Sequence, residues 1–313
     1  LGWWLLRVVV EAGSRLHAGF YYAGLDWGIR WGGLGFYVEE PRVVVEAREC
    51  SGLELTGFHG REGDVLRVLK LLNLDGVCLR ALSLIPAHVG LGSTTQLLLA
   101  SAMAALAVKG LELDPLDVAS RIGRGRVSWV GSLLFKLGGF VIDSGTPSPS
   151  RPKPLARLEV PEAWEFVMVT PSVERGFRED EEQVLLDKPW DPSLEASYHM
   201  SRGALRLASA IARGDLRDAL EGLREVQLGT GLYFSRVQGG VYRGVLEAVV
   251  ERAASRGVIL AQSSWGPTLY TIADEGESTR IAEILRGLLK ELGLGGSVRV
   301  SKPRNRGATI LKL

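Results

Sequence analysis

Residues 85–96, IPAHVGLGSTTQ, lead directly into the apolar run at 97–108, LLLASAMAALAV. Glycines allow a tight turn in which backbone N–H groups converge on an anion. Leu, Ala and Met favour a helix, and a run that is apolar on nearly every side indicates a buried one, whose N-terminus adds a positive dipole end at the same point. After the strand expected near 77–84, this pattern predicts a glycine turn, a buried helix and a phosphate site formed by Gly90, Leu91, Gly92, Ser93, Thr94 and Thr95.

The spacing of this loop leaves an alternative open. The loop lacks the lysine of a Walker-type phosphate loop, which excludes that motif. Glycine turns before helices are also common where no ligand binds. An ordinary tight turn in front of a core helix therefore stays an equal interpretation on spacing alone.

The segments before this loop predict strands. The six letters RVVVEA occur at 7–12 and again at 42–47, and β-branched runs of this kind favour paired strands. Between them, residues 18–38 are rich in glycine and aromatic residues. Glycine disfavours a helix there, so we expect a strand, a loop and a strand that line a cleft.

The second half of the chain has the order of an α+β layer. The Pro- and Ser-rich stretch at 146–154 predicts a boundary between domains 1–155 and 156–313. An antiparallel sheet with helices on one side fits the order that follows. We expect strands at 164–170, 258–261, 268–272, 298–300 and 307–313, and helices at 194–213, 215–226, 241–255 and 280–292.

Composition limits the function. The 313 residues are 46% hydrophobic and carry a net charge of +1, so we expect two packed domains and no nucleic-acid partner. The apolar start is too short to span a membrane, which predicts no membrane partner. The only two cysteines, Cys50 and Cys78, favour a reducing, cytoplasmic location.

Several motifs in sequence order carry a resemblance to a known family. Pro86 and the loop at 90–94 resemble the second motif of GHMP kinases. Six further regions follow one another along the chain: SRLHAG (14–19), HVGLGSTTQ (88–96), GRGRVS with GGFVIDSG (123–145), QGGVY (238–242), QSSWGPTLY (262–270) and NRGA (305–308). Within that superfamily they resemble the β-ribofuranosylaminobenzene 5′-phosphate synthase family, and QSSWGP after an upstream QGGVY is more specific than the glycine loop.

This resemblance implies a fold and a reaction. The fold would be a GHMP-kinase-like, two-domain α+β fold with a ribosomal S5 domain 2-like N-terminal domain and a ferredoxin-like C-terminal domain. The reaction would join phosphoribosyl pyrophosphate to 4-aminobenzoate or 4-hydroxybenzoate with loss of CO2 and pyrophosphate, in methanopterin-type cofactor biosynthesis. Mg²⁺ as cofactor and a homodimer are further implications of the resemblance, whereas the metal ligands stay unassigned.

The expected chemistry selects candidate residues. Positive charge and oriented donors suit a leaving pyrophosphate, and a carboxylate suits a cationic sugar carbon. Each candidate also has a structural alternative: a core histidine or tryptophan, a turn aspartate, or a solvated turn for Arg124 and Arg126. The candidate catalytic residues are Arg15, His17, Asp26, Arg30 and Asp143, and the candidate substrate-binding residues are Gln262, Ser263, Ser264 and Trp265.

Two departures from family patterns keep other functions open. GHMP kinases carry an acid after the glycine-loop helix in a Ser-Gly-x-x-Asp segment, but residues 128–132 are SWVGS. The synthase pattern expects acids where this chain has Tyr22 and Trp31. The alternatives are an ATP-dependent small-molecule kinase and a non-catalytic homologue that binds a phosphorylated metabolite.

Overall fold

The computed structural model describes residues 6–24, 28–146, 152–173 and 192–313. A seven-stranded sheet is built around two long antiparallel strands, β1 (Arg7–Ala23) and β2 (Trp31–Glu49). Val8 lies opposite Ala47 and Glu11 opposite Val44, which confirms that the two RVVVEA segments are paired strands. The other strands of this sheet are β3 (Leu53–Thr56), β4 (Val77–Ser83), β5 (Phe140–Asp143), β6 (Pro154–Leu158) and β11 (Thr309–Lys312).

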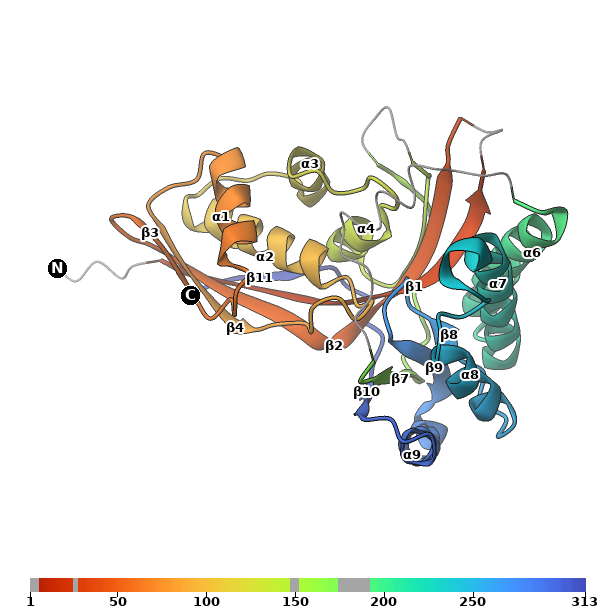
Figure 1. Cartoon of the computed structure of the whole chain (residues 1–313). Helices are drawn as coiled ribbons and strands as arrows, with labels where there is room; N and C mark the ends of the chain where they lie inside the picture. The colour runs from red at the N-terminus through yellow and green to blue at the C-terminus, as the bar shows by residue number, and fades with distance from the viewer. Residues whose placement is uncertain (1–5, 25–27, 147–151, 174–191) are drawn as a thin grey trace.

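Four helices cover one face of this sheet, drawn above it in Figure 1. They are α1 (Glu62–Leu71), α2 (Ser93–Val108), α3 (Pro115–Arg121) and α4 (Val130–Leu137). The predicted helix α2 is buried along nearly its whole length. Gln96 fixes it between the sheet and α4, since it accepts from the Tyr37 hydroxyl at 2.9 Å and donates to the Gly131 carbonyl at 2.9 Å.

A second sheet, in the order β10-β7-β9-β8, forms the other layer. Its strands are β7 (Trp164–Pro171), β8 (Ala261–Gln262), β9 (Leu269–Asp274) and β10 (Gly296–Ser301), and α8 (Leu246–Ala254) and α9 (Glu275–Glu291) complete a separate apolar core. The strand expected at 307–313 does not join this layer, because β11 pairs with β1 of the first sheet. The predicted boundary at 155/156 falls inside β6, so the division into 1–155 and 156–313 stays a prediction.

Helices α6 (Leu194–Arg213) and α7 (Leu216–Gln238) form an antiparallel hairpin beside β1. The helix predicted at 215–226 was too short, because α7 continues through two further glycines. A Cβ at Gly229 would lie 2.5 Å from the Met200 backbone nitrogen, so close packing against α6 outweighs the poor helix propensity of glycine.

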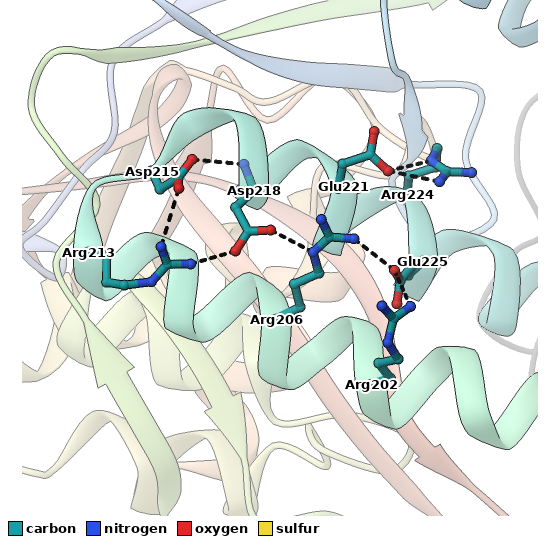
Figure 2. Close-up of polar contacts among 8 residues, drawn as sticks. All are labelled: Arg202, Arg206, Arg213, Asp215, Asp218, Glu221, Arg224 and Glu225. Carbon is teal, nitrogen blue, oxygen red and sulfur yellow. Dashed lines mark hydrogen bonds and ion pairs between the residues drawn. The ribbon is translucent and has the colours of Figure 1, made fainter.

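Figure 2 shows the ion pairs that connect this hairpin. Arg206 is shared by Asp218 at 2.6 Å and Glu225 at 2.9 Å. Arg202 also contacts Glu225 at 2.6 Å, and Arg213 contacts Asp218 at 2.5 Å. Networks contribute more than isolated surface pairs, so this one fixes the register of α7, whose inner face borders the site below.

Two further observations concern the chain as a whole. Cys50 and Cys78 form a disulfide between the end of β2 and the start of β4, a pairing that is not expected from two cysteines alone. A disulfide does not support the reducing environment that cysteine usage favoured, so the cytoplasmic location stays a prediction.

Among the helices described, none has the length and apolarity to cross a membrane.

A buried arginine attaches the C-terminal segment to the first sheet. Arg304 is fully buried and contacts Glu39 at 2.5 Å. Its guanidinium also donates to Thr309 Oγ1 at 2.9 Å and to the Gly307 carbonyl at 3.2 Å. Arg306 contacts the same acid at 2.8 Å but is 64% exposed. Glu39 thus forms one ion pair with a buried arginine and one with an exposed arginine.

We expect Arg304→Met to lower the free energy of unfolding by about 3–5 kcal/mol. The change removes the buried partner of Glu39, and it also removes the donor of the Gly307 carbonyl and of Thr309 Oγ1. Arg306→Met should cost about 1 kcal/mol or less, as exposed pairs do. Chemical denaturation measures both. Equal losses in the two variants would contradict this account.

Candidate active site

A large cleft of about 970 Å³ lies along the N-terminus of α2. Its lining is strongly basic, because the only acid among the described lining residues is Asp64. Asp64 pairs with two arginines of the same wall, Arg67 at 2.6 Å and Arg61 at 3.7 Å. We call this the basic cleft, and its arginines are Arg15, Arg61, Arg67, Arg121, Arg124 and Arg126.

The glycine loop forms the floor of the basic cleft. Gly90 and Gly92 have positive φ of 90° and 71°, and Gly92 is the N-cap of α2 without a side-chain cap. The helix therefore presents backbone N–H groups at this end, which suits an anion. Ser93, Thr94 and Thr95 line the cleft, whereas Leu91 is buried. The geometry fits the predicted phosphate site, which stays a prediction.

Two arginines hold the loop in place. Arg15 Nη1 donates to the Gly90 carbonyl at 3.2 Å, and Arg61 Nη2 donates to Thr94 Oγ1 at 3.0 Å. Arg15 lies in a motif of the sequence, whereas Arg61, Arg67 and Arg121 could not be predicted. No motif surrounds these three residues in the sequence, so only the packing of α1 and α3 against α2 could reveal them.

The predicted segments meet at one serine. Ser263 Oγ donates to the Gly90 carbonyl at 2.6 Å and accepts the His17 backbone N–H at 3.0 Å. The contact is so close that a Cβ at Gly90 would lie 2.2 Å from the Ser263 carbonyl oxygen. The next residue, Ser264, has φ of +57°, and strained backbone of this kind is concentrated at functional sites. Three candidate segments thus converge.

A buried chain of hydrogen bonds runs behind this contact. His17 Nδ1 accepts from the Gly19 N–H at 3.2 Å, so the neutral ring carries its proton on Nε2 and directs it at Ser128 Oγ, 3.4 Å away. The Ser128 hydroxyl in turn donates to Asp143 at 3.1 Å. Every donor in the chain therefore points toward the carboxylate of Asp143.

The protonation of this network follows from its burial. Desolvation, followed by the nearby charge of Arg15, holds the pKa of His17 well below its usual range, so the imidazole is neutral at pH 7. Desolvation raises the pKa of Asp143 to about 6, while its hydrogen bonds oppose that rise. Asp143 is fully buried and is not part of the lining of the basic cleft. Its N–H donors are Gly33, Trp129 and Gly145.

A small pocket of about 70 Å³ opens from the basic cleft. We call it the side pocket. It shares His17, Phe20, Val127 and Ser264 with the cleft, so these four residues form its mouth. Its inner wall is formed by the face of α7 and by the predicted residues Gln262 and Trp265. Phe234 of α7 packs against Trp265 with ring centroids 5.0 Å apart.

The remaining predicted residues lie elsewhere. The backbone of Arg30 pairs with Thr146 at the end of the β1–β2 hairpin, and Arg30 does not line the basic cleft. Asp26 lies outside the described residues. Trp31 is buried against Tyr233 and Phe234, which is a structural role. Tyr22 is half-buried opposite Gly32 of β2.

The described residues do not form a metal site on their own. No group of three or more His, Cys, Asp or Glu side chains that could hold a metal ion occurs among them. Mg²⁺ is commonly held by one or two carboxylates together with substrate phosphates. The single carboxylate on the described cleft lining, Asp64, is already paired with arginines, so these residues do not fit a protein-built Mg²⁺ site.

Comparisons with known proteins agree on the superfamily. Residues 63–130 match the GHMP kinases N terminal domain, and residues 207–291 match the GHMP kinases C terminal domain. A homoserine kinase from Cytophaga hutchinsonii superposes with a TM-score of 0.73 over 97% of both chains. At 17% identity that likeness shows the fold alone. The predicted GHMP-kinase-like fold is therefore confirmed.

Two curated relatives match at nearly full length, and both are named β-ribofuranosylphenol 5′-phosphate synthase. The protein from Archaeoglobus fulgidus is 31% identical, over 95% of this chain and 97% of its own. The protein from Methanothermobacter thermautotrophicus is 28% identical, over 98% of this chain and 100% of its own.

The raised pKa of Asp143 makes a prediction about stability. Below about pH 6, the folded state binds a proton that an unfolded aspartate takes up only near pH 3.8, so stability from this group rises as the pH falls from 6 toward 4. Asp143→Asn removes that contribution. Its deficit in unfolding free energy should therefore be larger at pH 4.5 than at pH 7.5, by about 2 kcal/mol.

Denaturation at both pH values tests this prediction, with the exposed residue Asp75 changed to Asn as the matched control. Asp75→Asn should show no such difference. A deficit of Asp143→Asn that is the same at both pH values would contradict the raised pKa.

Proposed function

Because the chain belongs to the β-ribofuranosylphenol 5′-phosphate synthase family, we propose that it is a decarboxylating phosphoribosyltransferase. Its substrates would be phosphoribosyl pyrophosphate and a 4-substituted benzoate, either 4-hydroxybenzoate or 4-aminobenzoate. The products would be the aryl riboside phosphate, CO2 and pyrophosphate, for methanopterin-type cofactor biosynthesis. A homodimer in the cytoplasm is part of the same proposal.

The arginine-rich cleft at the glycine loop carries the proposal. Phosphoribosyl pyrophosphate has two anionic groups, the 5′-phosphate and the diphosphate, at opposite ends of the sugar. A cleft of about 970 Å³ with six arginines and a helix N-terminus suits both groups at once. Arginine forks bind phosphate oxygens in pairs, and they also stabilise the charge that grows on departing pyrophosphate.

The acids of the site favour this transfer over a kinase reaction. A kinase of small molecules benefits from a carboxylate that receives the proton of the attacking hydroxyl. Asp143 is fully buried beneath its N–H donors and Ser128, and Asp64 is paired with arginines. Among the described residues, the cleft thus offers positive charge in abundance and no carboxylate suited to that proton transfer. The transfer proposed here needs no base on the protein.

The steps of the proposed reaction balance without a proton. The C1–O bond of the sugar breaks, and pyrophosphate departs with the electron pair. The ring carbon that bears the carboxylate forms the new bond to C1, and its bond to the carboxylate then breaks to release CO2 and restore aromaticity. His17 is neutral and both of its ring nitrogens are engaged, so we assign it a positioning role at the junction of the two cavities.

A magnesium ion would be held by the diphosphate rather than by a cluster of side chains. This follows from the donor set of the described residues, which lacks a three-ligand cluster.

The first test measures CO2 release from carboxyl-labelled 4-hydroxybenzoate and 4-aminobenzoate, with phosphoribosyl pyrophosphate and Mg²⁺. We expect release that requires phosphoribosyl pyrophosphate, and no consumption of ATP in a parallel assay with ATP alone. The relative rates also rank the two benzoates. Folded protein that releases no CO2 from either benzoate would overturn the proposal, and ATP-dependent phosphorylation of a small molecule would favour the kinase alternative.

A second test concerns the arginine at the loop. Arg61→Met should raise the KM for phosphoribosyl pyrophosphate by about tenfold or more, because a charged donor beside the anion site is lost. The KM for the benzoate should stay within about twofold. Arg299→Met, an exposed arginine on β10, is the matched control and should change neither constant. An unchanged KM for phosphoribosyl pyrophosphate in Arg61→Met would place the phosphates elsewhere.

A further inference from the structure

The side pocket differs from the basic cleft in its volume, in its charge and in the aromatic residues that line it. It is small, at about 70 Å³, and no residue on its described inner wall carries a charge. Phe20, Phe234 and Trp265 contribute aromatic rings, and flat apolar walls of this kind bind planar rings. We propose that the side pocket receives the para-substituted edge of the acceptor's aromatic ring, with the para substituent innermost and the carboxylate end of the ring at the mouth, because the enclosed space is smaller than the roughly 150 Å³ of a cavity that binds a whole benzene. This inference rests on the proposed function.

The difference in charge sets the orientation of the ring. A carboxylate buried among neutral side chains would lose its hydration without gaining a partner, which is costly. At the mouth, the same carboxylate faces the basic cleft, where Arg15 lies beside His17. The ring therefore enters with its uncharged end first. This orientation also points the carbon that bears the carboxylate at the cleft, where the sugar would lie.

The inner wall offers hydrogen bonds to an uncharged para group. Gln238 Nε2 donates to the Gly240 carbonyl at 3.0 Å and to the Val241 carbonyl at 2.7 Å, which engages both amide hydrogens and leaves Oε1 as an acceptor. Thr230 Oγ1 accepts the Phe20 N–H at 3.0 Å, which leaves its hydroxyl hydrogen as a donor. A hydroxyl or amino group donates to such an acceptor.

This recognition would assist the chemistry as well as the binding. A para hydroxyl or amino group releases electron density to the ring carbon opposite it, which is the carbon that attacks the sugar. An acceptor for the hydrogen of that group strengthens the release. The basic cleft thus binds the anionic groups, and the side pocket binds the electron-rich ring.

Blocking the mouth tests the location. Val127 is half-buried and lines both cavities, so Val127→Phe adds atoms at their junction. We expect calorimetric titration with 4-hydroxybenzoate, in the presence of pyrophosphate and Mg²⁺, to show at least about tenfold weaker binding in this variant. Pyrophosphate binding should stay within twofold. Val245→Phe, the same change at an exposed position, is the control and should match the wild type. Unchanged benzoate binding in Val127→Phe, or none in the wild type, would overturn the inference.

Ligands that are extended at the para position test the orientation. The wild type should bind 4-ethoxybenzoate at least about tenfold more weakly than 4-hydroxybenzoate, because the small pocket has no room for the added carbons. Phe234→Leu enlarges the pocket, so this variant should bind 4-ethoxybenzoate nearly as tightly as 4-hydroxybenzoate. Equal binding of the two ligands by the wild type would show that the para group does not lie innermost, whether or not Phe234→Leu folds.

The failures of the two proposals are distinguishable. A wild type that binds 4-hydroxybenzoate in a Val127-dependent manner, yet forms no product, would defeat the proposed function and leave the pocket assignment in place. A wild type that releases CO2, but whose benzoate KM is unaffected by Val127→Phe, would defeat only the pocket assignment.

Discussion

The hydrogen bonds of Ser263 set the geometry on which the rest of the site depends. One hydroxyl binds the backbone of β1 at His17 and the glycine loop at Gly90, so three segments that are distant in the sequence meet at one oxygen atom. Glycine is required on both sides of the contact, because a Cβ at Gly266 would lie 2.2 Å from the Gly90 nitrogen. The basic cleft therefore has a floor made of both halves of the chain. Neither half could form it alone.

Much of this arrangement could be predicted from local patterns, and the rest depends on packing. The paired strands, the buried helix α2 and the full extent of α6 follow from periodicity and composition. The length of α7 does not, because Gly229 opposes helix locally and is required only by the approach of α6. The pairing of β11 with β1 is equally hidden, since a strand of four residues carries no sign of its partner. Motifs led to Arg15, His17 and Ser263, whereas Arg61 directly precedes α1 and Arg67 lies on it, in a stretch without a motif.

The site separates charges that hold the fold from charges that face the ligand. Asp143 is buried and surrounded by donors, so it orders Ser128 and through it His17. The arginines of the basic cleft have the opposite setting, because they face an open cavity in which one acid is shared between two of them. A single kind of interaction, the hydrogen bond to a charged group, thus serves rigidity in one place and anion recognition in the other. This division explains why an aspartate that sequence patterns nominate for catalysis lies behind the cavity wall.

The tryptophan at position 31, where the synthase pattern expects an acid, is connected with the side pocket. An acid at this position would be buried among Phe20, Tyr233 and Phe234 without a partner, which is costly. The indole instead stacks on Phe234 with ring centroids 5.8 Å apart, and Phe234 in turn forms part of the inner wall of the pocket. Trp31 therefore packs against a residue of the wall without being part of the pocket lining itself. The residue that departs most from the expected pattern is thus coupled, through one aromatic ring, to the shape of the pocket that we assign to the acceptor.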